Sequence, residues 1–293
     1  MTRLVPLPFV ALALWLAPPL RGASPASGDG PAELLVKVDE RVRSYYDRLT
    51  SITCTESVTQ EELKGNFQPN GKSRAFVYDL VVIREPAKAG DAELQVKAER
   101  RIKSIDGRAV DAVDLPHCTD PVPAYSDPLD FLLSRNQARF KFETVSKESN
   151  ADATVMAFAE TSARPTTASW KHHCFEADGG RIKGRMWIEP ATGDVMKLQT
   201  QLAEPFRIPV PGNDLQDRLH APVVERSDTT VRFKRVPFEN PEETLLLPES
   251  IVTVTVMRAV STPRMQTTQT FTNFRRFMTE VKVKDGASSD FHR

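Results

Sequence analysis

The first regular pattern of apolar positions along the chain predicts a helix over residues 31–50. In PAELLVKVDERVRSYYDRLT the apolar side chains recur at spacings of three and four residues. That spacing places them on one stripe of a helix, with most charged side chains elsewhere. The stripe consists of Leu35, Val38, Val42, Tyr45 and Leu49. Such an amphipathic helix must pack against another apolar surface.

Most of the remaining chain has the alternating pattern of β-strands. Segments rich in β-branched residues are separated by turns that contain Gly, Pro, Asn and Asp. The clearest unit is RIKGRMWIEPATGDVMKLQTQL (181–202), a hairpin in which Met186 and Leu198 are expected on the same face. The segment SDPLDFLLSRN (126–136) predicts a short second helix. One helix followed by many antiparallel strands predicts an α+β, mostly-β fold.

The N-terminus predicts export. MTRLVPLPFVALALWLAPPLRGAS (1–24) has a basic residue, an apolar stretch of roughly ten residues and a small-residue cleavage site, the layout of a secretory signal peptide. We expect cleavage after Ala23. Prolines interrupt the apolar stretch, whereas a transmembrane anchor needs about 20 unbroken apolar residues. No cysteine near the cleavage site offers a lipid attachment point. The mature protein is therefore expected to be periplasmic or secreted.

The mature chain is expected to be almost neutral. Cleavage removes Arg3 and Arg21 from the 39 basic residues and no acid, which leaves 37 basic against 39 acidic residues, a net charge of −2. Nucleic-acid binding is not expected, because it requires a clustered basic face. The expected organisation is a signal peptide at 1–23, a flexible segment at 24–30, a single β-sheet domain at 31–280 and a flexible tail at 281–293.

Familiar catalytic motifs are absent from the sequence. It contains no GxSxG, GxxxxGK[ST] or HExxH motif, and no GxGxxG motif after a strand. The pair Gly179-Gly180 leads into a predicted strand rather than a helix, so a hairpin turn is favoured over a phosphate-binding loop. We therefore expect no cofactor and no catalytic residue, and predict that the protein is not an enzyme.

Two His-Cys dipeptides are the best candidates for metal ligands in this sequence. If ASWKHHCFE (168–176) forms one strand, His172 and Cys174 share a face and could ligate zinc together with His117 and Cys118. A metal-dependent hydrolase could use such a site. Strong zinc signatures, however, separate the paired ligands of each half by two to four residues. Here His117 and Cys118 are adjacent, and a single residue separates His172 from Cys174.

The same cysteines suit a disulfide better. An exported protein meets oxidising conditions, where three cysteines predict one bridge and one remaining thiol. Cys118 lies in a Pro-rich loop and Cys174 lies at a strand end. A bridge between them closes a loop of about 57 residues and stabilises the fold by roughly 4 kcal/mol on the entropic model. Cys54, inside a strand, is then a small buried apolar residue.

The order of several segments resembles a known group of proteins. After the amphipathic helix come ITCTESVTQ, GRMWIEPATGDVMKLQ, LLLPESIVTVT and TFTNFRRF. This order is similar to that of uncharacterised secreted bacterial proteins and, more distantly, of the periplasmic lipoprotein-carrier and lipoprotein-sorting proteins (the LolA-like and LppX-like group). The resemblance implies a strongly curved antiparallel sheet, an unclosed barrel, with the N-terminal helix and a short second helix packed on it.

The resemblance also implies a hydrophobic cavity that shields acyl chains from water, with a lipid or lipoprotein as the ligand. The candidate lining residues are Phe131, Leu132, Met186, Ile188, Met196 and Leu198. The alternative is a cell-envelope structural or interaction protein, which has a filled core and an envelope protein as its partner. Fold alone does not decide between these two functions.

Overall fold

The computed structural model describes residues 30–49, 52–85, 95–110, 128–148, 153–162, 166–171, 174–209, 221–258, 260 and 262–276. Its helices are α1 (Pro31–Arg48), the 3-10 helix η1 (Asp130–Leu132) and α2 (Ser134–Gln137). Its strands are β1 (Ile52–Leu63), β2 (Pro69–Glu85), β3 (Gln95–Ile105), β4 (Arg108–Ala109), β5 (Phe140–Glu148), β6 (Ala153–Glu160), β7 (Thr167–Lys171), β8 (Cys174–Asp178), β9 (Ile182–Ile188), β10 (Val195–Leu202), β11 (Phe206–Arg207), β12 (Val223–Glu239), β13 (Glu242–Arg258) and β14 (Arg264–Arg276).

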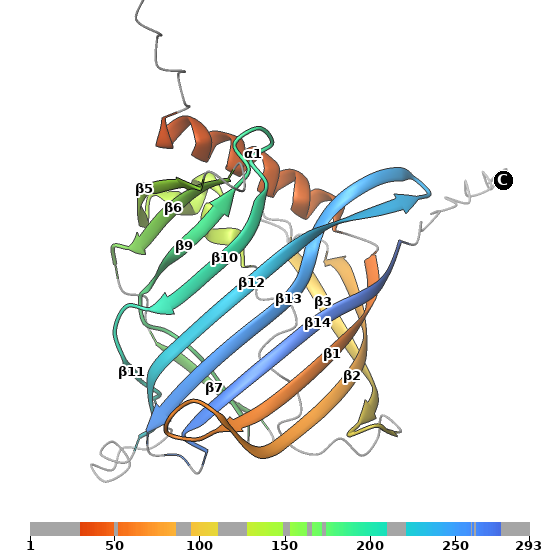
Figure 1. Ribbon diagram of the computed structural model, residues 1–293, viewed down its shortest axis with the longest axis vertical. Coiled ribbons are helices and arrows are strands. Elements are labelled where there is room, and N and C mark those ends of the chain that lie inside the picture. The colour runs from red at the N-terminus through yellow and green to blue at the C-terminus, as the bar shows by residue number, and fades with distance from the viewer. Residues whose placement is uncertain are drawn as a thin grey trace, which may run out of the picture.

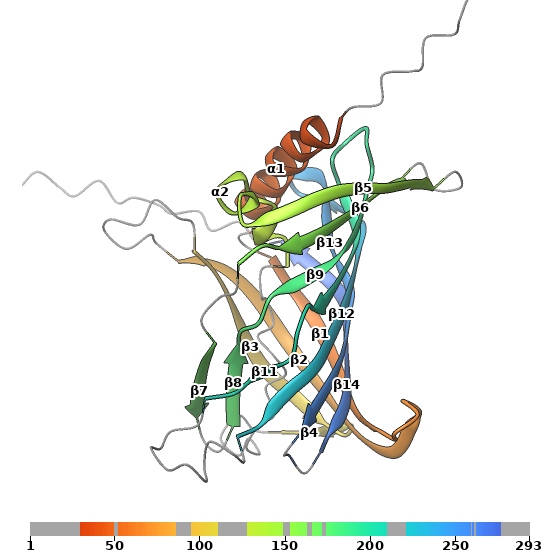
Figure 2. The ribbon, with the colours of Figure 1, turned by 90° about the vertical axis from the view of Figure 1, so that its left-hand side faces the viewer.

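Twelve of the strands form one antiparallel sheet. Its order is β4-β3-β2-β1-β14-β13-β12-β10-β9-β6-β5, and β11 pairs with β12 (Figure 1). β1 lies between β2 and β14, so the first and the last of the described strands are adjacent in the sheet. Figure 2 shows that the sheet curves around a concave side, where the hairpin of β7 and β8 lies. The predicted mostly-β fold with an open, curved antiparallel sheet is confirmed.

Helix α1 lies across one end of this sheet (Figures 1 and 2). Pro31 occupies the first turn, where its missing N–H breaks no helical hydrogen bond, and Glu33 lies near the positive end of the helix dipole. The buried stripe consists of Leu34, Val38, Val42, Tyr45, Tyr46 and Leu49. These side chains join the largest hydrophobic cluster of the described residues, so the main core lies between α1 and the near end of the sheet.

The strands alternate as the sequence predicts. On β1, Ile52, Cys54, Glu56 and Val58 are buried, and the residues between them are half-buried. The predicted hairpin of β9 and β10 is confirmed, with Met186 directly opposite Leu198. The predicted second helix is shorter than expected, because η1 and α2 share the segment and break at Leu133, which has an extended backbone.

One predicted strand is wrong. Residues 168–176 do not form a single strand, because β7 ends at Lys171 and β8 begins at Cys174, and these two residues pair with each other across a hairpin. Gly179-Gly180 is also not a hairpin turn, since β8 pairs with β7 whereas β9 pairs with β6 and β10. The apolar alternation of the segment did not reveal that the chain reverses there.

Several expectations concern residues outside the described part of the chain. The signal peptide at 1–23 and the tail at 281–293 lie there, so these assignments and the domain limits stay predictions. None of the helices in the described part combines the length and apolar character that a membrane span requires.

Candidate functional site

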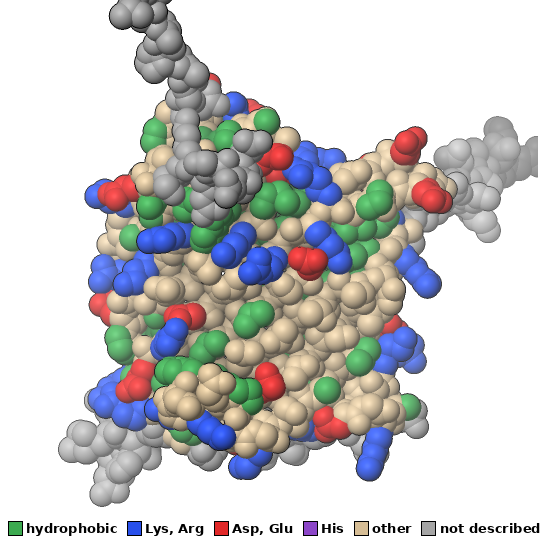
Figure 3. All heavy atoms as spheres, viewed as in Figure 1, with side chains coloured by type: hydrophobic (Ala, Val, Ile, Leu, Met, Phe, Trp, Pro, Cys, Tyr) green, Lys and Arg blue, Asp and Glu red, His purple; other side chains and the backbone are tan. Residues whose placement is uncertain are grey.

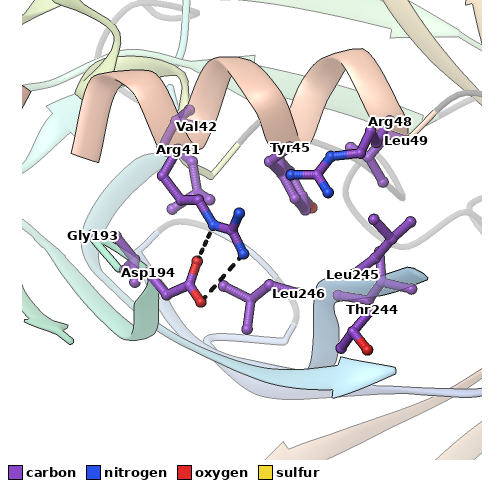
Figure 4. A pocket seen from close by; sticks show the side chains of 13 residues that line it. Arg41, Val42, Tyr45, Arg48, Leu49, Gly193, Asp194, Thr244, Leu245 and Leu246 are labelled. Carbon is purple, nitrogen blue, oxygen red and sulfur yellow. Dashed lines mark hydrogen bonds and ion pairs between the residues drawn. The ribbon is translucent and has the colours of Figure 1, made fainter. Parts of the chain in front are cut away.

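A small pocket lies between α1 and the sheet (Figure 4). The helix forms one wall, and the N-terminal part of β13 forms the opposite wall. Most of its lining is apolar and consists of Val42, Tyr45, Leu49, Leu129, Val195, Leu245, Leu246 and Leu247. The pocket is small: it suits about one or two water molecules and is too small for an acyl chain.

The leucine run of β13 builds one wall of this pocket. Successive side chains of a strand point to opposite faces, so three consecutive buried residues need cover on both faces of the strand. Leu245, Leu246 and Leu247 are all buried. The pairing of β12 with β13 shifts register next to this run, between Arg232 and Phe233. The apolar run in TLLLP thus marks the point where the sheet meets the helix.

An ionic network closes one edge of the pocket. Asp194 has no exposed surface, and its carboxylate accepts hydrogen bonds from Arg41 of α1 and, at 2.7 Å, from Arg235 of β12. Arg235 also donates to Glu189, at 2.5 Å. Burial raises the pKa of Asp194, but the hydrogen bonds from the two arginines outweigh it and hold that pKa below its ordinary value. The carboxylate therefore joins helix and sheet as an anion.

The turn that carries Asp194 fits closely against the helix. Gly193 has a φ of +76°, and a Cβ at this position would lie 2.8 Å from the carbonyl oxygen of Lys37. Only glycine suits both the positive φ and this close approach. The PATGD segment therefore forms the turn between β9 and β10 and also packs against α1.

Arg48 stands at another edge of the pocket. Its guanidinium donates hydrogen bonds to the carbonyl oxygen and the hydroxyl of Ser44, on the same helix. Figure 4 shows the side chain reaching back along α1 toward Tyr45. Arg48 is half-buried, and it forms no ion pair with a carboxylate among the described residues. This cation is therefore available to an anionic group at the pocket.

A second polar cluster lies inside the curved sheet. Glu56 of β1 is fully buried and accepts two hydrogen bonds from Arg100 of β3, at 2.7 and 2.8 Å. Gln269 of β14 donates a third, at 2.9 Å. Next to it, burial first and then the carboxylates of Glu56 and Asp79 raise the pKa of the Cys54 thiol to about 12. This cluster ties three strands together, and its buried carboxylate already has its partners.

The structure places the six predicted lining residues together. Leu132, Met186, Ile188 and Leu198 belong to the main core cluster, and Phe131 and Met196 pack against it. Four of them are almost fully buried, and the rings of Phe131 and Phe158 lie 4.6 Å apart. None of the six lines the pocket under α1. Their role as the lining of a ligand cavity stays a prediction.

The His/Cys residues fall mostly outside the described chain. His117, Cys118 and His172 lie there, and Cys174 is described only as the first residue of β8. The disulfide between Cys118 and Cys174 and the alternative zinc site both stay predictions. Within the described ranges, no group of three His, Cys, Asp or Glu side chains is arranged to hold a metal ion. Cys54 is buried with a free thiol.

Sequence reasoning missed the charged residues of both sites. Glu56 gave a usable signal, because it occupies an inward position of an alternating strand, between Cys54 and Val58. Arg41, Arg48 and Asp194 gave none, since charged residues on a helix or after a turn are common on protein surfaces.

Comparisons with known proteins give one match. No family model matches the sequence, and no curated protein is similar to it. Among solved structures, the chain is similar to a LolA superfamily protein from Nitrosomonas europaea, with 9% sequence identity and a TM-score of 0.35. The match covers 83% of this chain and 94% of the other. At that identity and TM-score the likeness indicates neither the activity nor the ligand of this chain.

Proposed function

We propose that this chain is an exported, non-enzymatic binding module that holds an amphiphile between α1 and the curved sheet. The observation that carries the proposal is the pocket under α1, which combines an apolar lining with Arg48, a cation that forms no ion pair with a carboxylate of the described residues. The other arginine of the lining, Arg41, is already paired with Asp194. A molecule with an apolar chain and an anionic end has the complementary chemistry. A fatty acid and an anionic lipid belong to this class, whereas the acyl group of a lipoprotein is joined by an ester or amide bond and supplies only the apolar chain.

Burial of an apolar chain can supply the affinity without any catalytic group. Each methylene transferred from water into an apolar site contributes about 0.8 kcal/mol. Arg48 can hydrogen-bond an anionic end without giving up an ion pair, because its described partner is the neutral Ser44. The apolar chain of the ligand thus supplies the binding affinity, and the guanidinium of Arg48 fixes the orientation of the ligand.

The pocket must widen to take such a ligand. The apolar stripe of α1 and a few polar contacts hold the helix in place, among them Arg41 with Asp194 and Arg43 with Ser134. Movement of α1 away from Leu245 and Leu246 enlarges the pocket without breaking the sheet. The ligand then takes the place of part of the helix contact.

A second function is favoured by the density of the core. The six side chains expected to line a cavity are packed into the main cluster, and the pocket under α1 is small. A cell-envelope structural or interaction protein with a filled core, which binds another protein and no small ligand, accounts for this packing. The two functions make different predictions, since only the first requires that the protein bind an amphiphile.

A fluorescent long-chain fatty acid, titrated into the mature protein, tests the proposal. Thr244 lines the pocket and is exposed, so Thr244→Trp fills its mouth without overpacking the core. We expect binding to weaken by about tenfold or more. Thr272→Trp is the matched control, since Thr272 is exposed on β14, away from the pocket. Absence of binding to the unmodified protein, or equal effects of the two variants, would favour the filled-core protein.

The role of Arg48 has its own readout. Arg48→Gln should weaken binding of the fatty acid by about tenfold, because one charge-assisted hydrogen bond is lost. Binding of the corresponding methyl ester should not change. An equal loss for acid and ester would show that Arg48 supports the helix and does not bind the anionic end.

A further inference from the structure

A cluster of cations that form no ion pair within the described part of the chain lies on the convex face of the sheet, apart from the pocket. We call it the basic patch, and it consists of Lys183, Arg185, Lys197 and Arg232, with Trp187 among them. Lys183, Arg185 and Arg232 are exposed, and Lys197 and Trp187 are half-buried. Figure 3 shows Lys and Arg side chains gathered across this face, over the region of β9, β10 and β12.

Strand register brings these residues onto one face. Lys197 of β10 pairs directly with Trp187 of β9 on one side and with Arg232 of β12 on the other. Lys183, Arg185 and Trp187 are spaced two residues apart along β9, so their side chains point to the same side of the sheet. Their neighbours, Met186 and Ile188, point inward and are fully buried.

The patch has no internal neutralisation. None of its four cations forms an ion pair with a carboxylate of the described residues. Three nearby acids are engaged elsewhere: Asp228 pairs with Arg226, and Glu189 and Asp194 both pair with Arg235. Glu249 is exposed beside Arg232 at the register shift of β12 and β13, so among the described residues the four cations face a single acid that pairs with none of them. Like charges directly opposite each other on neighbouring strands, such as Lys197 and Arg232, destabilise a sheet. The arrangement is therefore unfavourable for the isolated fold and favourable when an anionic surface lies against it.

The single aromatic residue of the patch adds to its character. The ammonium of Lys197 lies 4.0 Å from the centre of the Trp187 ring, a cation–π contact that keeps the indole on the outer face. Tryptophan beside lysine and arginine suits the boundary between water and a lipid bilayer, where the ring is partly buried and the cations meet headgroups.

We propose that the basic patch docks this protein on the surface of a membrane that contains anionic phospholipid. An anionic bilayer fits better than an acidic protein, because the cores of protein interfaces are apolar and depleted in lysine. Here the cations are interspersed with Gln199, Gln201 and Thr230, and no apolar centre is present. A diffuse negative surface potential attracts such a patch without requiring a matched shape.

The position of the patch links it to the pocket, but the inference does not depend on a ligand. β9 and β10 carry the patch, and the turn between them places Gly193 and Asp194 at the pocket. Docking through these strands would bring the pocket near the headgroups. The patch can bind a membrane whether or not the pocket takes an amphiphile, and separate experiments test the two proposals.

Vesicle co-sedimentation tests the docking. The mature protein is mixed with vesicles of phosphatidylcholine alone, or of equal parts phosphatidylcholine and phosphatidylglycerol, in low salt and in roughly 0.5 M NaCl. We expect binding only to the anionic vesicles, lost in high salt. The double variant Lys197→Gln/Arg232→Gln should weaken it by about twenty-fivefold, since each cation near an anionic surface changes partitioning by about fivefold.

Matched controls keep the result specific. Lys64→Gln/Arg275→Gln removes the same charge from exposed positions outside the patch, and it should weaken binding far less. The patch variant should keep or raise the melting temperature, because it removes a repulsive pair. Emission of Trp187 should shift to shorter wavelength on binding, and Trp187→Phe should abolish most of that shift while Trp170→Phe does not.

Three outcomes would overturn the proposal. The first is no binding to anionic vesicles in low salt, which is also the result for a patch that binds only acidic protein. The second is equal weakening by the patch variant and the control variant. The third is binding that persists in high salt and on neutral vesicles, because it would come from apolar contact elsewhere.

Discussion

At the scale of single residues, the described part of the interior contains three buried carboxylates, and arginines neutralise all three. Glu56 accepts from Arg100, Asp194 accepts from Arg41 and Arg235, and Glu160 accepts from Arg139. A buried charge without a partner is strongly destabilising, so each carboxylate depends on its arginine. The sites of Glu56 and Asp194 differ in location, since the first lies within the sheet and the second joins sheet to helix.

The stabilisation that Asp194 provides should depend on pH. Its pKa in the folded protein lies below the ordinary value of 3.8, so folding favours the ionised form. The stabilisation is complete well above pH 4 and is lost as the pH falls through the lower folded-state pKa. We expect Asp194→Asn to lower the free energy of unfolding by about 2 kcal/mol at pH 7, and this difference to shrink below about pH 4.

Urea denaturation at a series of pH values measures this effect. Glu204→Gln is the control, because Glu204 pairs with Arg181 at the surface and should change the unfolding free energy little at any pH. A difference between Asp194→Asn and the unmodified protein that stays constant down to pH 2 would contradict the assignment.

The Cys54 thiol should be inert in the folded protein. Burial and the neighbouring carboxylates raise its pKa to about 12, so almost no thiolate exists at pH 8. We expect a thiol reagent at pH 8 to leave Cys54 unmodified until urea unfolds the chain. The count after unfolding also tests the predicted disulfide: one reactive thiol supports the bridge between Cys118 and Cys174, and three reactive thiols exclude it.

At the scale of elements, α1 contributes most through its buried stripe. Val38 is fully buried against the sheet, whereas Val36, two residues earlier on the same helix, is 59% exposed. Val38→Asp should therefore lower the unfolding free energy by about 3 kcal/mol or more, because it buries an unpaired carboxylate. Val36→Asp should change it by less than about 0.5 kcal/mol.

Thermal and urea denaturation of the two variants, side by side, provide the measurement. Both substitutions have the same effect on helix propensity and net charge, so their difference reports the contact of α1 with the sheet. Equal destabilisation would mean that α1 does not pack on the sheet through this stripe.

At the scale of the whole molecule, the sheet depends on a pairing between the two ends of the chain. β14 lies between β1 and β13, and without it both of these long strands lose a neighbour. A chain that ends at Pro263 should not fold cooperatively, because two long unpaired edges would be exposed. A chain that ends at Glu280 should fold, in agreement with the domain limit predicted from the sequence.

Near-ultraviolet circular dichroism and urea denaturation distinguish the two truncations. Retention of a cooperative transition by the shorter chain would show that the sheet is stable without β14. Loss of the transition in the longer chain would show that the domain extends beyond residue 280.

The sequence by itself determined the local structure of this protein. The helix period of residues 31–50 and the alternation along β9 and β10 are properties of neighbouring residues, so the pattern alone predicts them. The pattern failed at residues 168–176, because Trp170, His172 and Cys174 keep the two-residue spacing of a single strand although β7 ends and β8 begins between them.

Only the tertiary structure decided which distant residues meet. The contact of Arg41 with Asp194 spans 153 positions, and the contact of Glu56 with Gln269 spans 213. The basic patch arises in the same way, since Lys197 and Arg232 become neighbours only through the register of β10 and β12. Strand order and register depend on interactions summed over the whole sheet, which no local pattern contains.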